Sequence, residues 1–171
     1  MKGDDTKEAY VLATMSVAHF RLLLGEADEA KRLIDECAKI LEPLDSVDLA
    51  VHAAFYSVSG DYHKAKAEYA DYYKNSLLYL ACIDVSTDLS SEDRISRAHD
   101  LAISALMGKI YNFGELLLHP ILDALTESDY DWMRELLFAF NSGDISKFDA
   151  LTQHLKKEVS TCHCLLYDHP S

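Results

Sequence analysis

Apolar residues recur at helical spacing along almost the whole chain, and this pattern constrains the fold more than any other feature. Between residues 8 and 24 the apolar positions Val11, Met15, Ala18 and Leu22 follow one another at intervals of four, three and four. Such spacing places the side chains on one face of an α-helix. No convincing run alternates with the period of two that a half-buried β-strand shows. The sequence therefore predicts an all-α protein.

The helices are expected to form antiparallel pairs that repeat. A turn at Gly25 separates the first helix from a second at about residues 29–41, and Pro43 lies just beyond its end. A third helix is expected over 48–58, a turn at Gly60, and a fourth helix over 65–80. Gly25 and Gly60 are 35 positions apart, close to the period of about 34 in tetratricopeptide repeats. This spacing predicts tetratricopeptide-like stacking of helix pairs.

Further helices are expected downstream. Ser90 followed by Asp93 is typical of a helix cap and predicts a helix over 92–107. The apolar stretch 113–125 contains His119-Pro120, so we expect two short helices with a kink between them. Helices from Ser128 to about Phe140 and over 145–157 follow. The domain organisation that we predict is a disordered N-terminus over 1–7, a helical-repeat domain over 8–157 and an irregular tail over 158–171.

Composition excludes several functional classes. The 171 residues include 29 acidic and 16 basic residues, for a net charge of −13. Binding to nucleic acid needs clustered Lys and Arg, so we expect no nucleic-acid partner. No apolar run approaches the ~20 residues that cross a bilayer, and the first residues lack the apolar core of a secretory signal. Cys37 and Cys82 lie in apolar helical stretches and are expected to be buried thiols. We predict a soluble, acidic protein of a reducing compartment.

The sequence carries none of the usual catalytic signatures. It has no Walker-type phosphate loop, dinucleotide-binding glycine motif, nucleophile elbow or His-Glu-x-x-His zinc motif. Cys162-His163-Cys164, with His169 nearby, offers ligands that suit zinc. Structural zinc sites, however, use two separated ligand pairs, so we predict an irregular tail without metal. We accordingly predict no catalytic residues, no cofactor and no small-molecule substrate.

Other polar and aromatic residues have structural explanations that compete with functional ones. His19, His52 and His99 adjoin expected apolar faces and are interpreted as structural. Glu26, Asp28 and Glu29 begin a helix, where carboxylates interact favourably with the helix dipole. Residues 82–135 contain eleven acids and four bases, which indicates a solvated surface or, less favoured, a surface for a basic partner. Five tyrosines could line a peptide groove, although packing between helices is favoured: Tyr62, Tyr69, Tyr72, Tyr73 and Tyr79.

Three strings carry a family resemblance. YYKNSLLYL at 72–80, NFGELLLHP at 112–120 and AFNSGD at 139–144 together resemble PCI-family subunits of the proteasome regulatory-particle lid. The resemblance covers about residues 48–150 well and extends from about residue 8. It implies a right-handed helical-repeat superhelix that belongs to a PCI module. It further implies a non-catalytic role in lid assembly and ubiquitin-dependent degradation, with other lid subunits as partners in the cytoplasm and nucleus.

The chain also departs from this family. It begins where the family has earlier helical repeats, and the resemblance ends after about Leu155. We therefore expect a truncated form without the winged-helix domain. Two alternatives remain open at this point. One is a free-standing adaptor that binds peptides through the tyrosines, and the other is a PCI-type subunit of another complex, such as the signalosome or an initiation factor.

Overall fold

A computed structural model shows an all-helical chain that divides into two compact units, residues 1–88 and 89–171. The structure describes residues 2–44, 46–108, 110, 113–126, 128–152 and 154, and the side chains from residue 5 onward. The described residues contain no strand. The all-α prediction is thus confirmed. The sequence predicted a single helical-repeat domain over 8–157, and the structure divides into two compact units. None of the described helices is long and apolar enough to span a bilayer.

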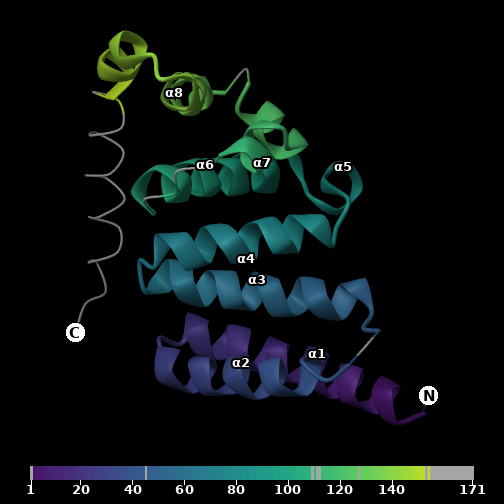
Figure 1. Ribbon diagram of the computed structural model, residues 1–171. Coiled ribbons are helices and arrows are strands. Elements are labelled where there is room, and N and C mark those ends of the chain that lie inside the picture. Colours follow the sequence, from purple (N-terminus) through teal and green to yellow (C-terminus); the bar gives the residue numbers. More distant parts are fainter. Residues whose placement is uncertain are drawn as a thin grey trace. The chain divides into compact units, whose positions relative to one another are not determined.

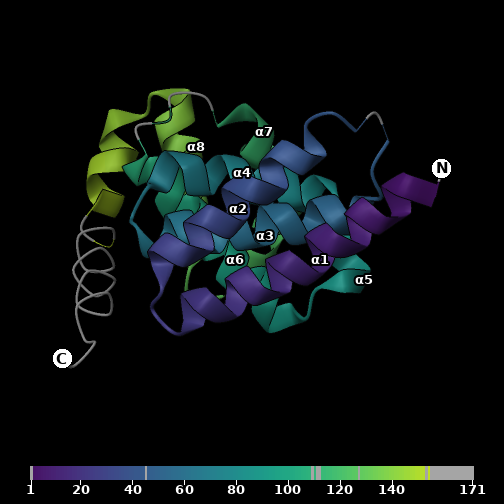
Figure 2. The ribbon, with the colours of Figure 1, turned by 90° about the horizontal axis from the view of Figure 1, so that it is seen from below.

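Unit 1 consists of two helix hairpins and a short helix (Figures 1 and 2). The hairpins are α1 (Lys2–Leu23) with α2 (Ala27–Leu41), and α3 (Leu49–Ala65) with α4 (Tyr69–Ala81). The short helix is α5 (Val85–Asp88). Residues 2–7, where we expected disorder, form the first turns of α1. Helix α3 packs against both α1 and α2.

The core of unit 1 is built from the apolar stripes that the sequence predicted. Val11, Met15 and Ala18 of α1 are at most 1% exposed, and Ile34 and Cys37 of α2 face them. The same cluster continues into α3 through residues that the sequence did not assign to it, namely Val51, Val58 and Tyr62. Burial of this shared apolar surface is the main force that holds the two hairpins together.

The predicted turn at Gly60 is wrong. Helix α3 continues through Gly60, and the chain turns at Lys66–Glu68 instead. Gly60 is buried where α3 meets α4: a β-carbon there would lie 3.8 Å from Ser76 Oγ and 3.9 Å from a Tyr72 ring carbon. An added β-carbon would thus make ordinary van der Waals contacts, and a helical glycine of this kind cannot be distinguished from a turn glycine by a sequence-based rule.

The correct repeat length is 42 residues rather than 35. Both hairpin turns have the same backbone hydrogen bonds: Glu26 N donates to Arg21 O, and Glu68 N donates to His63 O, each at 2.9 Å. The position before each of these glutamates has positive φ, +80° at Gly25 and +56° at Ala67. Because 68 minus 26 is 42, α1 and α2 correspond to α3 and α4 with that offset. In this register Ala18 corresponds to Gly60, a small residue at both helix contacts.

Ala67 offers a direct test of the corrected register. An L-residue with a side chain is strained in the left-handed region, by about 1–2 kcal/mol, whereas glycine is not. Ala67→Gly is therefore expected to raise the free energy of unfolding by up to about 1 kcal/mol, after the greater freedom of glycine in the unfolded chain is subtracted. Chemical denaturation followed by far-UV circular dichroism measures the change.

The matched control is Gly25→Ala, which introduces the same strain into the first turn. No atom lies within 4 Å of the added β-carbon, so only the backbone conformation changes. This variant is expected to lose about 1 kcal/mol. If Ala67→Gly also destabilised the protein, the equivalence of the two turns would be refuted.

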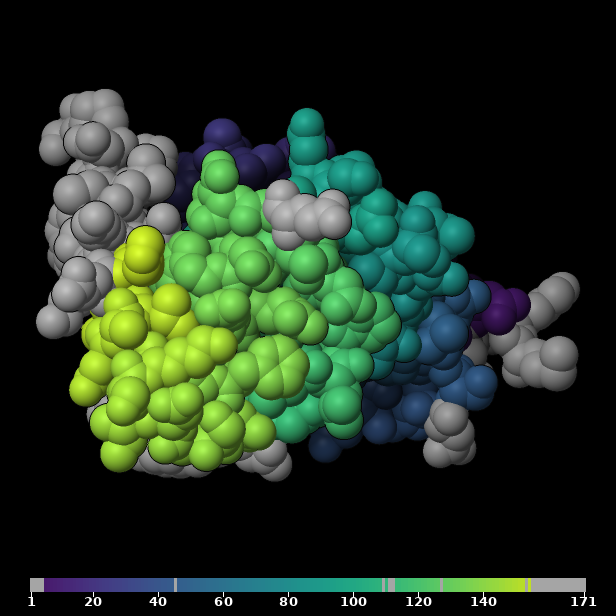
Figure 3. Space-filling view, turned by 90° about the horizontal axis from the view of Figure 1, so that it is seen from above, coloured from purple at the N-terminus to yellow at the C-terminus, as the bar shows by residue number. Residues whose placement is uncertain are grey.

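Unit 2 contains α6 (Ser91–Met107), α7 (Gly114–Leu117), the 3-10 helix η1 (Pro120–Leu125) and α8 (Asp131–Ser142), with a further helical stretch at 145–152. The kink predicted at His119-Pro120 is confirmed, and the predicted cap at Ser90 accepts a 3.1 Å hydrogen bond from Asp93 N. Helix α8 starts at Asp131, three residues later than predicted. In Figure 3 the green and yellow atoms of this unit form a continuous surface.

Candidate interaction surface

The tyrosines that could have lined a peptide groove are largely core residues. Tyr62, Tyr72 and Tyr73 are only 8%, 5% and 7% exposed, and Tyr69 and Tyr79 are half-buried. The Tyr62 ring packs edge-on against His63 at 5.2 Å, and the Lys31 ammonium lies 5.5 Å from its centre. The interpretation as packing between helices is confirmed for Tyr62, Tyr72 and Tyr73, whose buried rings are not available to line an open peptide groove.

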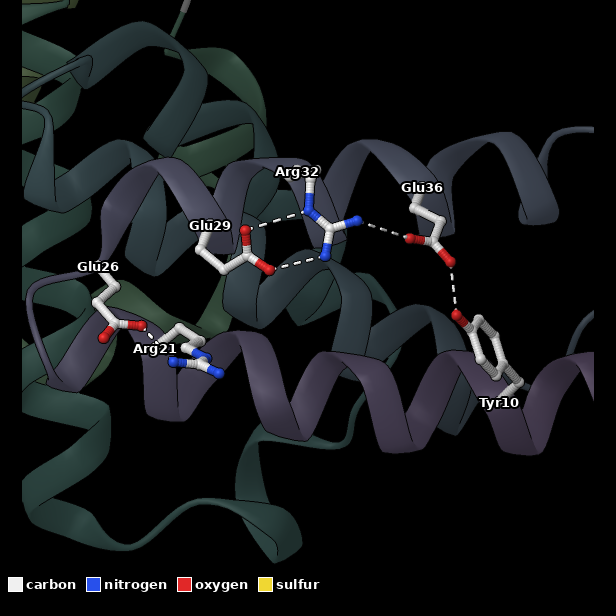
Figure 4. Close-up of polar contacts among 6 residues, drawn as sticks. All are labelled: Tyr10, Arg21, Glu26, Glu29, Arg32 and Glu36. Carbon is white, nitrogen blue, oxygen red and sulfur yellow. Dashed lines mark hydrogen bonds and ion pairs between the residues drawn. The ribbon is translucent and has the colours of Figure 1, made fainter.

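A chain of polar contacts links α1 to α2 on the surface of unit 1 (Figure 4). Arg32 binds both carboxylate oxygens of Glu29, with distances of 2.7 and 3.1 Å, and it lies 3.5 Å from Glu36. Glu36 accepts a hydrogen bond from the Tyr10 hydroxyl, and Arg21 pairs with Glu26 at the turn. These contacts are solvent-exposed, and exposed pairs of this kind contribute little stability. They pair the polar side chains of the two helices with one another on the surface of the hairpin.

Two of these contacts shift the pKa of a participating side chain. The hydrogen bond from Arg32 lowers the pKa of Glu29, and the hydrogen bond to Glu36 raises the pKa of Tyr10. Both shifts favour the protonation states already present at neutral pH. Glu26, Asp28 and Glu29 lie at the start of α2, as predicted for residues that interact with the helix dipole.

Three neighbouring side chains of unit 1 are of types that can ligate a metal cation. His63, Glu68 and Asp71 offer ligand atoms that lie within 4.8 Å of one another, and His63 Nδ1 is 2.6 Å from Glu68 Oε2. One repeat earlier, the equivalent positions are Arg21 and Glu26, which form the same contact across the first turn. The His63–Glu68 pair is therefore explained as a turn-closing contact. Sequence reasoning missed this cluster because it placed the turn at Gly60.

Each of the three histidines interpreted as structural contacts an aromatic or acidic side chain. His19 Nδ1 lies 3.6 Å from Asp61 Oδ2, the His52 ring stacks on Tyr56 at 5.8 Å, and the His99 ring meets Tyr130 edge-on at 4.6 Å. These contacts support the structural interpretation of all three. Cys162, His163, Cys164 and His169 lie outside the described residues.

His119 has a structural role within the family-like string. Its Nδ1 accepts a 3.1 Å hydrogen bond from Ile121 N and so caps η1. Burial lowers the pKa of this imidazole, and Glu115 opposes the effect to a smaller extent. A proton on Nδ1 would abolish the hydrogen bond, because the nitrogen would no longer have a free lone pair.

This cap predicts a pH dependence. A group with a lowered folded pKa contributes stability that is present above its unfolded pKa and is lost as pH falls toward the folded value. Stability of unit 2 is therefore expected to fall as the pH drops below about 6.5, the ordinary pKa of histidine. His119→Asn keeps a capping oxygen and should remove that share of the pH dependence. Urea denaturation at several pH values, for the wild type and the variant, measures it; identical pH profiles would contradict the assignment.

The thiol of Cys37 is protected by the core of unit 1. Burial raises the pKa of Cys37 to about 11, with a smaller contribution from the Glu36 charge. At pH 8 its thiolate fraction is expected to be about 100-fold below that of an ordinary exposed thiol. Alkylation with iodoacetamide, mapped by mass spectrometry, should label Cys37 slowly in the native protein and rapidly in urea. Cys82, which is only partly buried, serves as the internal comparison, and equal native rates would refute the prediction.

The repeated hairpins of unit 1 and the helices of unit 2 define a class of protein, the all-α helical-repeat proteins. A family model described as PSD13 N-terminal repeats matches residues 1–137. The chain belongs to that family.

Named relatives agree with this assignment. The chain is 43% identical over 151 residues to the Schizosaccharomyces pombe protein named "Probable 26S proteasome regulatory subunit rpn9", which covers 88% of this chain. It is 41% identical over 158 residues, 91% of the chain, to the Saccharomyces cerevisiae "26S proteasome regulatory subunit RPN9". It is 40% identical over 152 residues, 85% of the chain, to the Arabidopsis thaliana "26S proteasome non-ATPase regulatory subunit 13 homolog B". These matches confirm the resemblance to proteasome regulatory subunits, and the signalosome and initiation-factor alternatives are not favoured.

The matches cover only part of each relative. The chain spans about two fifths of their length, 39% in each of these three cases. What the complete relatives do therefore applies to this chain only as a proposal.

Proposed function

We propose that this chain acts as a non-catalytic structural element of the proteasome regulatory-particle lid. In this role it would support lid assembly, and thereby ubiquitin-dependent degradation, through contacts with other lid subunits in the cytoplasm and nucleus. The observation that carries the proposal is identity of 40–43% to proteasome regulatory subunits over most of the chain. Stacked helix pairs suit this role because they expose broad faces to neighbouring proteins.

A non-catalytic role is supported by the use of the polar side chains. Among the described residues, the Arg21–Glu26 and His63–Glu68 pairs each bridge a hairpin turn. His119 accepts the hydrogen bond that caps η1. A catalytic base or nucleophile would instead need to face a pocket that admits substrate.

Co-purification tests the proposal. A tagged form of this chain, expressed in cells, is expected to bring down lid subunits in amounts detectable by quantitative mass spectrometry. The full-length relative is the positive control, and a Phe113→Ala variant with a damaged core is the negative control. If the full-length relative captures the lid and this chain captures none of it, the proposed function is refuted while the family assignment stands.

A further inference from the structure

The two hairpin turns of unit 1 differ in charge. The first turn holds two acidic and two basic side chains that pair with one another (Figure 4): Arg21, Glu26, Glu29 and Arg32. Arginine is always charged in proteins, so these four side chains carry no net charge at neutral pH. The hydrogen bond from Arg32 lowers the pKa of Glu29, and the charge of Arg21 adds to the effect. Each carboxylate of the first turn thus has a guanidinium partner.

The second turn keeps the two acids but not both permanent positive charges. The 42-residue register places His63, Glu68, Asp71 and Lys74 at the equivalent positions. An imidazole therefore stands where the first turn has the guanidinium of Arg21. Because histidine is mostly neutral at pH 7, these four positions carry a net charge of about −1. The second turn lacks one positive charge that the first turn has.

Three of these side chains are spaced to bind a metal ion. His63 Nδ1 lies 2.6 Å from Glu68 Oε2, and the ligand atoms of His63, Glu68 and Asp71 lie within 4.8 Å of one another. Zinc bonds of about 2.0–2.2 Å place neighbouring ligands of a tetrahedral site about 3.3 Å apart. Glu68 and Asp71 are exposed, so rotation of their side chains can bring the carboxylates to that spacing.

The imidazole is the most firmly held of the three ligands. Its side chain is only 19% exposed, and the ring packs edge-on against buried Tyr62. His63 belongs to the last turn of α3, whereas Glu68 caps α4 and Asp71 lies in its first turn. One ion bound by all three would join the two helices across the turn. A nitrogen ligand favours zinc over magnesium or calcium, which prefer oxygen ligands.

We propose that His63, Glu68 and Asp71 bind one zinc ion, which supplies at the second turn the positive charge that Arg21 supplies at the first. Water completes the coordination, because three protein ligands leave the fourth position of the zinc ion open. The ion holds the end of α3 against the start of α4. It thereby stabilises unit 1, since a ligand that binds only the folded chain shifts the equilibrium away from the unfolded one.

Isothermal titration calorimetry with zinc chloride tests the proposal on the complete chain. Cys162 and Cys164 are replaced by serine in every sample, so that thiols of the tail do not compete for the metal. One zinc ion per chain is expected to bind at micromolar concentration. His63→Arg gives the second turn the charges of the first, and it should weaken zinc binding at least about 10-fold, since loss of even an outer-sphere partner costs about that much. Asp71→Asn should weaken zinc binding to a similar extent.

His19→Ala is the matched control. It removes another histidine of unit 1 that lies beside a carboxylate, with Nδ1 3.6 Å from Asp61 Oδ2, and it should leave zinc binding unchanged. Thermal unfolding followed by circular dichroism gives a second readout. Excess zinc should raise the Tm of the parent chain and of His19→Ala but not that of His63→Arg, which should remain folded without metal. Excess magnesium should raise none of the three.

Three results would overturn the proposal. The first is a parent chain that binds no zinc up to millimolar concentration. The second is zinc binding that persists in both His63→Arg and Asp71→Asn, because the ion would then be held elsewhere in the chain. The third is an equal loss of binding in His19→Ala, which would show that the loss does not depend on the second turn.

Discussion

Phe113→Ala is expected to lower the free energy of unfolding of unit 2 by about 3–5 kcal/mol. Phe113 is 1% exposed and is the largest fully buried side chain among the described residues. Its ring lies 5.1 Å from that of Phe140, which in turn lies 5.6 Å from Phe148. Truncation would remove the transfer free energy of the ring and leave a cavity that the surrounding helices fill only in part.

The measurement can be restricted to unit 2. The single tryptophan, Trp132, lies in α8, so its fluorescence during urea denaturation reports on this unit. Phe138→Ala is the control: it removes an identical ring, but from a side chain that is 40% exposed, and should cost about 1 kcal/mol or less. Equal losses in the two variants would contradict the assignment of Phe113 to the core.

Tyr62→Ala is expected to lower the free energy of unfolding of unit 1 by about 3–5 kcal/mol. The side chain is 8% exposed and belongs to the cluster in which α3 packs on the first hairpin. Its loss would remove an aromatic contact with His63 and leave a void between the two repeats. Far-UV circular dichroism in urea measures the loss, and hydrogen exchange of the α1 and α3 amides shows whether it is local to this junction.

Tyr69→Ala provides the comparison, because Tyr69 is half-buried at the start of α4 and should cost less than half as much. Comparing the two variants also distinguishes two interpretations of the tyrosines, a peptide-binding groove and packing between helices. A groove residue would lose peptide binding with little change in stability, whereas a core residue unfolds the unit. A Tyr62→Ala variant as stable as the wild type would overturn the packing interpretation.

Local sequence patterns predicted the individual helices well. The buried stripe of α1, the end of α2 before Pro43, the cap at Ser90 and the kink at His119-Pro120 are all present as expected. These features depend on the spacing of apolar residues and on hydrogen bonds within a few positions, both of which the sequence displays directly. The family could likewise be inferred, since strings of consecutive residues carry it.

The surface features were less accessible from the sequence. The contact between His63 and Glu68 could not be foreseen while Gly60 was taken for the turn, and the burial of Tyr62 depends on α1 and α2, which are distant in sequence. The correspondence between exposed apolar residues of α1 and buried residues of α3, such as Phe20 and Tyr62, was equally hidden, because it depends on the 42-residue register.

The sequence by itself thus determined that the chain is helical, which residues form the inner stripe of α1, and the family to which it belongs. Only the tertiary structure decided where the second hairpin turns, which tyrosines are buried and which residues of α1 are exposed. The physical reason is the same in each case. A glycine at a turn and a glycine within a helix look alike in sequence, and burial is set by residues that folding brings together from far apart in the chain.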